Sequence, residues 1–271
     1  MCDEFNISVV QIRSEYMHAY DFEVFDALAY RKFFETWRPL VYIIIGVYLL
    51  GIYYGQKWME KRPAFRLNTA LFLWNAALAI FSIAATIRGY PEAIYFLSKP
   101  NGSYLAVCSG DTTNYAMLFW GLLFVISKVV ELGDTAFIIL RKQKLIVLHW
   151  FHHILTLFGC WVAAEYAPAA SRFYFVNTFV HSFMYTYYAL KALKVQIPRR
   201  ISMTITIIQI LQMVVGVYFI GILLYTLKLG RPCRINIELL YYGAFLILSF
   251  LALFLNFFVR TYLQRSKDKV Q

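Results

Sequence analysis

Long apolar segments recur along the whole chain, and they leave it few ways to fold. Each has close to the roughly 20 residues that a helix needs to cross a bilayer. Inside lipid a segment must satisfy its own backbone N–H and C=O groups, which favours helices. The sequence therefore predicts an all-α polytopic membrane protein with seven transmembrane helices. The segments cover residues 39–56, 67–88, 114–140, 146–166, 171–190, 201–227 and 237–259.

Composition agrees with a lipid environment. Of the 271 residues, 61% are hydrophobic, against roughly 45–50% in soluble domains, and the mean hydropathy is +0.57. Only 15% of residues are charged, yet the net charge is +11. In a membrane protein such a surplus indicates cytosolic loops, whereas a nucleic-acid-binding protein would need a basic stripe on a soluble fold. We expect membrane lipid as a partner, and no nucleic acid.

Charge also predicts the orientation of the chain. With seven spans, the segments 57–66, 141–145, 191–200 and 260–271 lie on one side, and they hold most of the Lys and Arg residues but only two acidic ones, Glu60 and Asp268. The positive-inside rule places that side in the cytosol. Residues 1–38 are rich in acidic groups and have no early apolar core, so they do not resemble a signal peptide. We expect a lumenal tail at 1–38, a seven-helix domain at 39–259 and a basic cytosolic tail at 260–271.

Several short signals fit this orientation. Asn6 and Asn101 begin glycosylation sequons on the predicted lumenal side. Cys108 and Cys233 also fall there, where they either form a disulfide or remain free thiols. Lys267 and Lys269 look like a dilysine endoplasmic-reticulum retrieval signal, although they could also be an ordinary basic anchor.

Polar residues inside the predicted spans share one depth. At about 1.5 Å per residue, the polar groups of four spans lie about 12 to 15 Å from the cytosolic loops. Ionisable groups in a membrane are costly, so a functional role is the default interpretation. A buried network that holds the helices together is the alternative for each amide, and an interfacial belt is the alternative for the tyrosines. The residues are Lys128, Glu131, Asp134, His149, His152, His153, Asn177, His181, Tyr185, Tyr187, Tyr188, Gln209 and Gln212.

The histidines leave two chemistries open. Membrane desaturases have similar histidine boxes, but they need many more imidazoles; a single metal ion on His149, His153 and His181 with a carboxylate stays possible. A catalytic cysteine is not expected, because Cys160 lies at another depth and on no polar stripe. The other possibility is acid–base or nucleophilic histidine chemistry. An apolar bundle with a basic cytosolic mouth would suit a substrate with a lipid tail and an anionic head.

Four short motifs carry a resemblance to a known family. The run from Lys128 to Thr135 resembles the K-x-x-E-x-x-D-T motif of the ELO family of very-long-chain fatty-acid elongases, and 149–153 resembles its H-x-x-H-H box. Residues 181–188 resemble H-x-x-M-Y-x-Y-Y, and 206–212 resemble T-x-x-Q-x-x-Q. All four occur in order with family-like spacing, and the resemblance covers nearly the whole chain.

The resemblance implies a function and a more specific fold. It implies 3-ketoacyl-CoA synthase activity in the endoplasmic reticulum, in which a long-chain acyl-CoA and malonyl-CoA give 3-ketoacyl-CoA, CO₂ and CoA. No cofactor is expected beyond these CoA esters. A 3-ketoacyl-CoA reductase, a 3-hydroxyacyl-CoA dehydratase and an enoyl-CoA reductase would be partners, and a homo-oligomer is possible. Six helices would surround a closed-ended acyl tunnel, with the first span outside. Residues 140–150 resemble the branch acting on saturated and monounsaturated chains.

Residue roles follow from the cysteine-free polar layer. His152 is expected to be the nucleophile, while His149, His153 and His181 would orient or protonate. The group of Lys128, Glu131 and Asp134 is either a structural network or a catalytic support. Basic residues at the mouth could bind the CoA phosphates or only set topology. These residues are Arg141, Lys142, Lys144, Lys191, Lys194, Arg199 and Arg200.

Two non-enzymatic classes are disfavoured by the sequence. A retinal-binding receptor would need a lysine in the last span, and 237–259 contain none. A transporter would show helix-breaking glycine or proline in mid-membrane. Here the glycines are scattered, and the prolines are expected to lie in loops.

Overall fold

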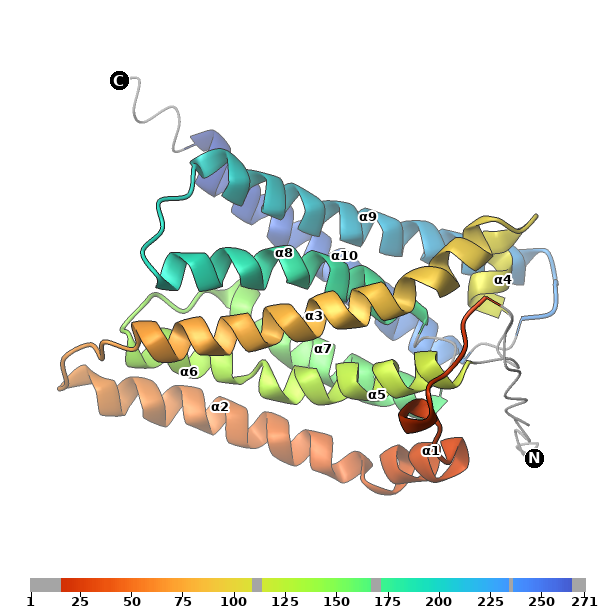
Figure 1. Ribbon diagram of the computed structural model, residues 1–271, viewed down its shortest axis with the longest axis horizontal. Helices are drawn as coiled ribbons and strands as arrows, with labels where there is room; N and C mark the ends of the chain where they lie inside the picture. Colours follow the sequence, from red (N-terminus) through yellow and green to blue (C-terminus); the bar gives the residue numbers. More distant parts are fainter. Residues whose placement is uncertain (1–15, 109–113, 167–171, 234–235, 265–271) are drawn as a thin grey trace.

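The computed structural model describes residues 16–108, 114–166, 172–233 and 236–264, and within them helices run side by side along the long axis of the molecule (Figure 1). A short 3₁₀ turn, η1 (Asp21–Glu23), comes first, and a π-helical turn, η3 (Val259–Gln264), comes last. The helices between them are α1 (Ala27–Thr36), α2 (Arg38–Glu60), α3 (Asn68–Leu97), α4 (Gly102–Cys108), α5 (Tyr115–Val130), α6 (Gly133–Leu140), α7 (Val147–Tyr166), α8 (Tyr174–Ala192), α9 (Arg199–Lys228) and α10 (Ile237–Phe258).

Five helices in the described part of the chain are long and apolar enough to cross a membrane. They are α2, α3, α7, α9 and the continuous run of α10 and η3. This confirms the predicted all-α, multi-pass membrane protein, while the count of seven stays a prediction. The other two predicted spans differ for separate reasons: 114–140 is broken into two helices, and α8 carries Asn177, His181 and several tyrosines along its length.

The predicted single span at 114–140 is interrupted in its middle. Helix α5 ends at Val130 and α6 begins at Gly133, with Glu131 and Leu132 between them. Here the backbone tightens: the N–H of Leu132 bonds the carbonyl of Val129 (3.2 Å), three residues back. A Cβ at Gly133 would lie 2.6 Å from the ring of Trp74, so glycine allows α3 to approach at this break.

Helix α3 runs further than the sequence predicted. Its predicted end at residue 88 is wrong, because the helix continues through Pro91 to Leu97. The expectation that prolines lie only in loops is therefore also wrong. Arg88 is accommodated because it pairs with Glu23. Beyond it, α3 packs closely on α8, since a Cβ at Gly89 would lie only 2.6 Å from the Cβ of Phe175.

The two ends of the bundle are chemically different (Figure 1). The turns after α2, α6 and α8 lie together at one end, which we call the basic end; they are the segments from which the sequence predicted a basic side. Helices α1 and α4 lie at the opposite end. There, Glu23 pairs with Arg88, Glu92 with Arg172 and Glu165 with Arg38, and we call this the ion-pair end.

A disulfide reinforces the ion-pair end. The structure joins Cys108, at the end of α4, to Cys233, in the turn between α9 and α10. Asn101 is exposed in the turn just before α4. Asn6, Lys267 and Lys269 lie outside the described residues.

Candidate active site

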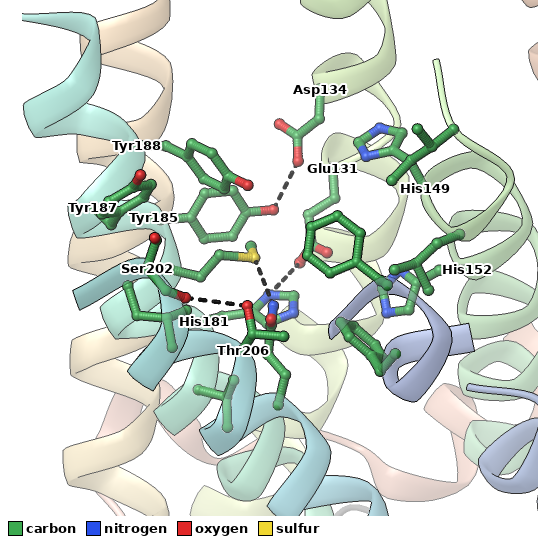
Figure 2. A pocket seen from close by; sticks show the side chains of 18 of the residues that line it. Glu131, Asp134, His149, His152, His181, Tyr185, Tyr187, Tyr188, Ser202 and Thr206 are labelled. Atoms are coloured by element: carbon green, nitrogen blue, oxygen red, sulfur yellow. Dashed lines mark hydrogen bonds and ion pairs between the residues drawn. The ribbon is translucent and has the colours of Figure 1, made fainter. Parts of the chain in front are cut away.

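A cavity of about 550 Å³ opens between α3, α6, α7, α8, α9, α10 and η3. Its wall includes Val180, Ile205 and Phe254, together with a concentration of polar groups. Figure 2 shows the histidines of α7 on one side and the tyrosines of α8 on the other, with Glu131 and Asp134 between them. The cavity therefore combines apolar walls with titratable side chains.

The cavity collects most of the polar residues that the sequence singled out. They come from separate helices, and their common depth predicted that they would lie close together. Those that line it are Glu131, Asp134, Arg141, His149, His152, His153, Asn177, His181, Tyr185, Tyr187, Tyr188, Gln209 and Gln212.

Lys128 lies just behind the cavity wall and connects two of these groups. Its Nζ donates to Glu131 Oε1 (2.8 Å) and to Asn177 Oδ1 (2.8 Å). The Asn177 amide group then faces the Nε2 atom of His181 at 3.3 Å. Because Asn177 Oδ1 accepts from the lysine, its Nδ2 must donate, so His181 Nε2 is the acceptor. The other ring nitrogen, Nδ1, lies 3.8 Å from Glu131 Oε1. Through Asn177, Lys128 thus fixes the ring orientation of His181 and makes its Nε2 atom the acceptor.

Asp134 is held from two sides. Trp74 Nε1 donates to its Oδ1 at 2.6 Å, and the Tyr185 hydroxyl donates to its Oδ2 at 2.9 Å. These bonds tie α3, α6 and α8 together at the cavity wall. The sequence alone does not reveal the role of Trp74, because its partner lies 60 residues away and nothing local marks the contact.

The three histidines of α7 differ in their partners. His149 Nε2 lies 3.0 Å from the Thr135 hydroxyl oxygen. His153 is buried, and its Nδ1 has no hydrogen-bond partner among the described residues. The His152 ring packs against Phe250 (centroids 4.9 Å apart), lines the cavity, and makes no side-chain hydrogen bond within the described ranges. His152 is therefore the histidine most available to a bound molecule.

The basic residues of the mouth do not behave alike. Arg141 lines the cavity, whereas the Nζ atom of Lys142 bonds the carbonyl of Glu60 at 3.2 Å. Arg199 donates to the carbonyl of Thr261 at 2.8 Å. The remaining predicted CoA contacts lie at the basic end without lining the cavity: Lys144, Lys191, Lys194 and Arg200.

Further wall residues carry no strong sequence signal. Ser202, Tyr262 and Asn75 line the cavity from α9, η3 and α3. Thr206, part of a recognised motif, contacts the Tyr262 hydroxyl at 3.4 Å. Such residues are common in helices for other reasons, so only the fold reveals their place.

The metal alternative lacks a ligand set in the described part of the chain. No group of three or more His, Cys, Asp or Glu residues there is arranged to hold a metal ion.

Comparisons with known proteins point the same way as the motifs. The family model described as ELO: GNS1/SUR4 family matches residues 32–270. Very long chain fatty acid elongase 3 of Mus musculus is 42% identical over 96% of this chain and 94% of its own length. Very long chain fatty acid elongase 6 of Drosophila melanogaster is 40% identical over 94% of this chain and 82% of its length. The Homo sapiens elongase 6 is 34% identical over 97% of both chains. On this evidence of near-complete coverage, the chain belongs to the ELO (GNS1/SUR4) family.

Proposed function

We propose that this protein catalyses the condensing step of fatty-acid elongation. A long-chain acyl-CoA and malonyl-CoA would give 3-ketoacyl-CoA, CO₂ and CoA. The observation that carries the proposal is one cavity shared by residues of all four family motifs, with His152 open to it. Relatives named as very long chain fatty acid elongases support the substrate class.

His152 serves as the acyl acceptor. A ring nitrogen attacks the thioester carbonyl, the C–S bond breaks, and the CoA thiolate leaves with the proton that the imidazole loses. The product is an acyl-imidazole, a reactive acyl donor. Exclusion of water from this part of the cavity would protect the acyl-imidazole bond from hydrolysis.

Decarboxylation then drives the second half. Malonyl-CoA loses CO₂, and the electron pair of the broken C–C bond forms an enolate. The enolate carbon attacks the acyl carbon, the C–N bond to His152 breaks, and the departing ring nitrogen takes up one proton from solvent, which restores the neutral imidazole. His181, held by Asn177 and Lys128, and Tyr185, held by Asp134, line the cavity in which this step takes place.

The substrate lies along the bundle axis. Its CoA phosphates meet Arg141 at the basic end, and its acyl chain extends toward the ion-pair end in a tunnel surrounded by six helices, with α2 outside. The saturated and monounsaturated acyl-CoAs are the substrates that residues 140–150 favour. In this proposal the chain crosses the membrane seven times, with six spans around the tunnel and α2 as the seventh.

The same proposal includes the orientation of the enzyme in the membrane and its partners. The basic end faces the cytosol and the ion-pair end faces the lumen of the endoplasmic reticulum, with Asn6 and Asn101 as glycosylation sites. The enzyme needs no cofactor beyond its substrates. A reductase, a dehydratase and a second reductase complete the cycle as partners.

A direct assay tests the function. Purified protein is given radiolabelled malonyl-CoA and a panel of acyl-CoAs, and lipid products are identified by mass. A 3-ketoacyl product two carbons longer than the acyl donor is expected, and His152→Ala should form none. Wild-type protein that inserts and binds acyl-CoA, yet forms no such product with any donor, would refute the proposal.

A further inference from the structure

A hydrogen-bond chain links α2 to the histidine box, although α2 supplies no side chain to the cavity wall described above. The Tyr48 hydroxyl lies 2.7 Å from Thr135 Oγ1 on α6. Thr135 Oγ1 lies 3.0 Å from His149 Nε2 on α7. Tyr48 is 9% exposed and Thr135 is 2% exposed, so water competes little for these bonds. Three helices therefore meet in one polar chain.

The available hydrogens give this chain a direction. Tyr48 makes no other hydrogen bond within the described residues, so its O–H has only Thr135 as acceptor. Thr135 then donates its own hydrogen to His149 Nε2. The reverse order would leave a buried phenol hydrogen without an acceptor, which is costly. The Tyr48 and Thr135 hydroxyl hydrogens are both used only when His149 Nε2 is the acceptor, which places the proton of His149 on Nδ1.

His149 is in contact with the other histidines of the box. Its ring lies edge-on to the His153 ring, with centroids 4.5 Å apart. The His153 ring in turn lies 5.4 Å from that of His152. His153 Nδ1 has no hydrogen-bond partner among the described residues, so contacts with the neighbouring rings help to hold the His153 ring in place. The orientation of the His149 ring therefore affects that of His152 through the ring contacts with His153.

We propose that Tyr48 is a positioning residue of the active site, which acts through Thr135 to hold His149 in one orientation and as its Nδ1–H tautomer. It touches no substrate. The effect on turnover rests on the proposed function, but the tautomer does not. The helix outside the cavity wall thereby contributes to catalysis without entering the site.

The alternative is that Tyr48 only packs α2 against α6 and α7. A packing role predicts a lower melting temperature for Tyr48→Phe, with unchanged histidine chemistry and unchanged kcat. The two roles are separated by measurements on the histidine itself.

Nitrogen NMR on the ¹⁵N-histidine-labelled protein reads the tautomer directly. His149 signals are assigned by their loss in His149→Gln. In the wild type, Nδ1 should be the protonated nitrogen and Nε2 the unprotonated one. Tyr48→Phe should move the proton to Nε2 or populate both forms. Tyr53→Phe is the matched control, because Tyr53 lies on the same helix, is 60% exposed and makes no hydrogen bond within the described residues.

Kinetics supply the second readout. Tyr48→Phe should lower kcat roughly fivefold to tenfold with little change in KM, as loss of one orienting hydrogen bond predicts. Thr135→Val should have the same effect, Thr135→Ser should lose less, and the Tyr48→Phe/Thr135→Val pair should not be additive, because one chain is broken twice.

The outcomes separate this inference from the function. A wild-type His149 protonated on Nε2 overturns it, even if Tyr48→Phe fails to insert. Tyr48→Phe protein with wild-type nitrogen signals and wild-type kcat also overturns it. If the tautomer is as stated but no acyl donor is extended, the proposed function fails and the positioning of His149 stands.

Discussion

The ion-pair end and the cavity both bury charged or titratable side chains, but they treat them differently. At the ion-pair end, Glu23 is 0% exposed and receives hydrogen bonds from Arg88 and Trp120. In the cavity, His153 Nδ1 is buried without a described partner, and His152 faces open space. Buried polar groups are normally satisfied, so a group left unsatisfied beside a cavity indicates a role toward a ligand. We infer that the ion-pair end stabilises the fold and that the polar groups of the cavity act in catalysis.

The largest expected effect is on stability, at the ion-pair end. Removing the Cys108–Cys233 bond, which closes a loop of 125 residues, should cost about 2–5 kcal/mol of unfolding free energy. Protein that remains folded should keep its kcat, because the bond lies away from the cavity. Melting temperature and turnover are measured on Cys108→Ser, Cys233→Ser and the double variant. The three variants should agree, since each removes the same bond. A loss of kcat in folded protein would show that the ion-pair end also affects catalysis.

The Lys128–Glu131 pair is an ion pair that lies beside the cavity, so it could serve either the fold or catalysis. Glu131→Gln leaves the ammonium of Lys128, which is 2% exposed, without its carboxylate partner. We expect a lower melting temperature and a kcat lower by about a hundredfold, on the scale of a lost electrostatic contact in a site.

Ser127→Ala is the control for this pair. It removes a 3.0 Å hydrogen bond to the same carboxylate but leaves the charge in place. It should lower kcat far less than Glu131→Gln. If Glu131→Gln lowers only the melting temperature, the pair belongs with the structural ion pairs.

At the basic end, Arg141 and Lys142 are neighbours in sequence with different surroundings. Arg141→Gln should raise KM for both CoA substrates roughly fivefold to tenfold, because a charge-assisted bond to phosphate is lost. Lys142→Gln should change KM less than twofold on the same reasoning, since its Nζ is turned to the Glu60 carbonyl. Added salt should weaken binding to the wild type more than to Arg141→Gln. Equal KM values for the two variants would place the CoA phosphates elsewhere.

The smallest effect concerns pH at the ion-pair end. Burial alone would raise the pKa of Glu23, but hydrogen bonds from Arg88, the Tyr20 N–H and Trp120 outweigh it and hold the pKa below its ordinary value of 4.5. A lowered pKa stabilises the fold above the ordinary value and loses that contribution as pH falls through the folded value.

Melting temperature against pH measures this contribution. The wild type should exceed Glu23→Gln by a constant margin above the ordinary pKa of 4.5, and the margin should shrink only below it. A margin that shrinks between pH 7 and pH 5 would instead assign the titration to another group.

How far the sequence could predict this site depends on the distance over which its signals act. Periodicity and charge are local, so five of the spans, the shared depth of the histidines and the basic loops could be predicted from the sequence. Contacts between distant segments leave no local trace. Trp74 with Asp134, and Tyr48 with Thr135, join residues 60 and 87 positions apart.

The interruption after Val130 was missed for a related reason. The segment 114–140 is uniformly apolar apart from its motif residues, so periodicity predicts one helix. Gly133 is the available signal, but its importance comes from the Trp74 ring that packs against it. Equally, the extension of α3 to Leu97 includes Arg88, whose partner Glu23 lies 65 residues away, a contact that sequence alone does not reveal.

The most direct test of the proposed mechanism is whether His152 carries the acyl group. Purified protein is incubated with a long-chain acyl-CoA alone, and its intact mass and the free CoA are measured. We expect one acyl adduct per chain with matching CoA release, both absent in His152→Ala. Protein that condenses both substrates, yet shows neither adduct nor CoA release with acyl-CoA alone, would contradict it.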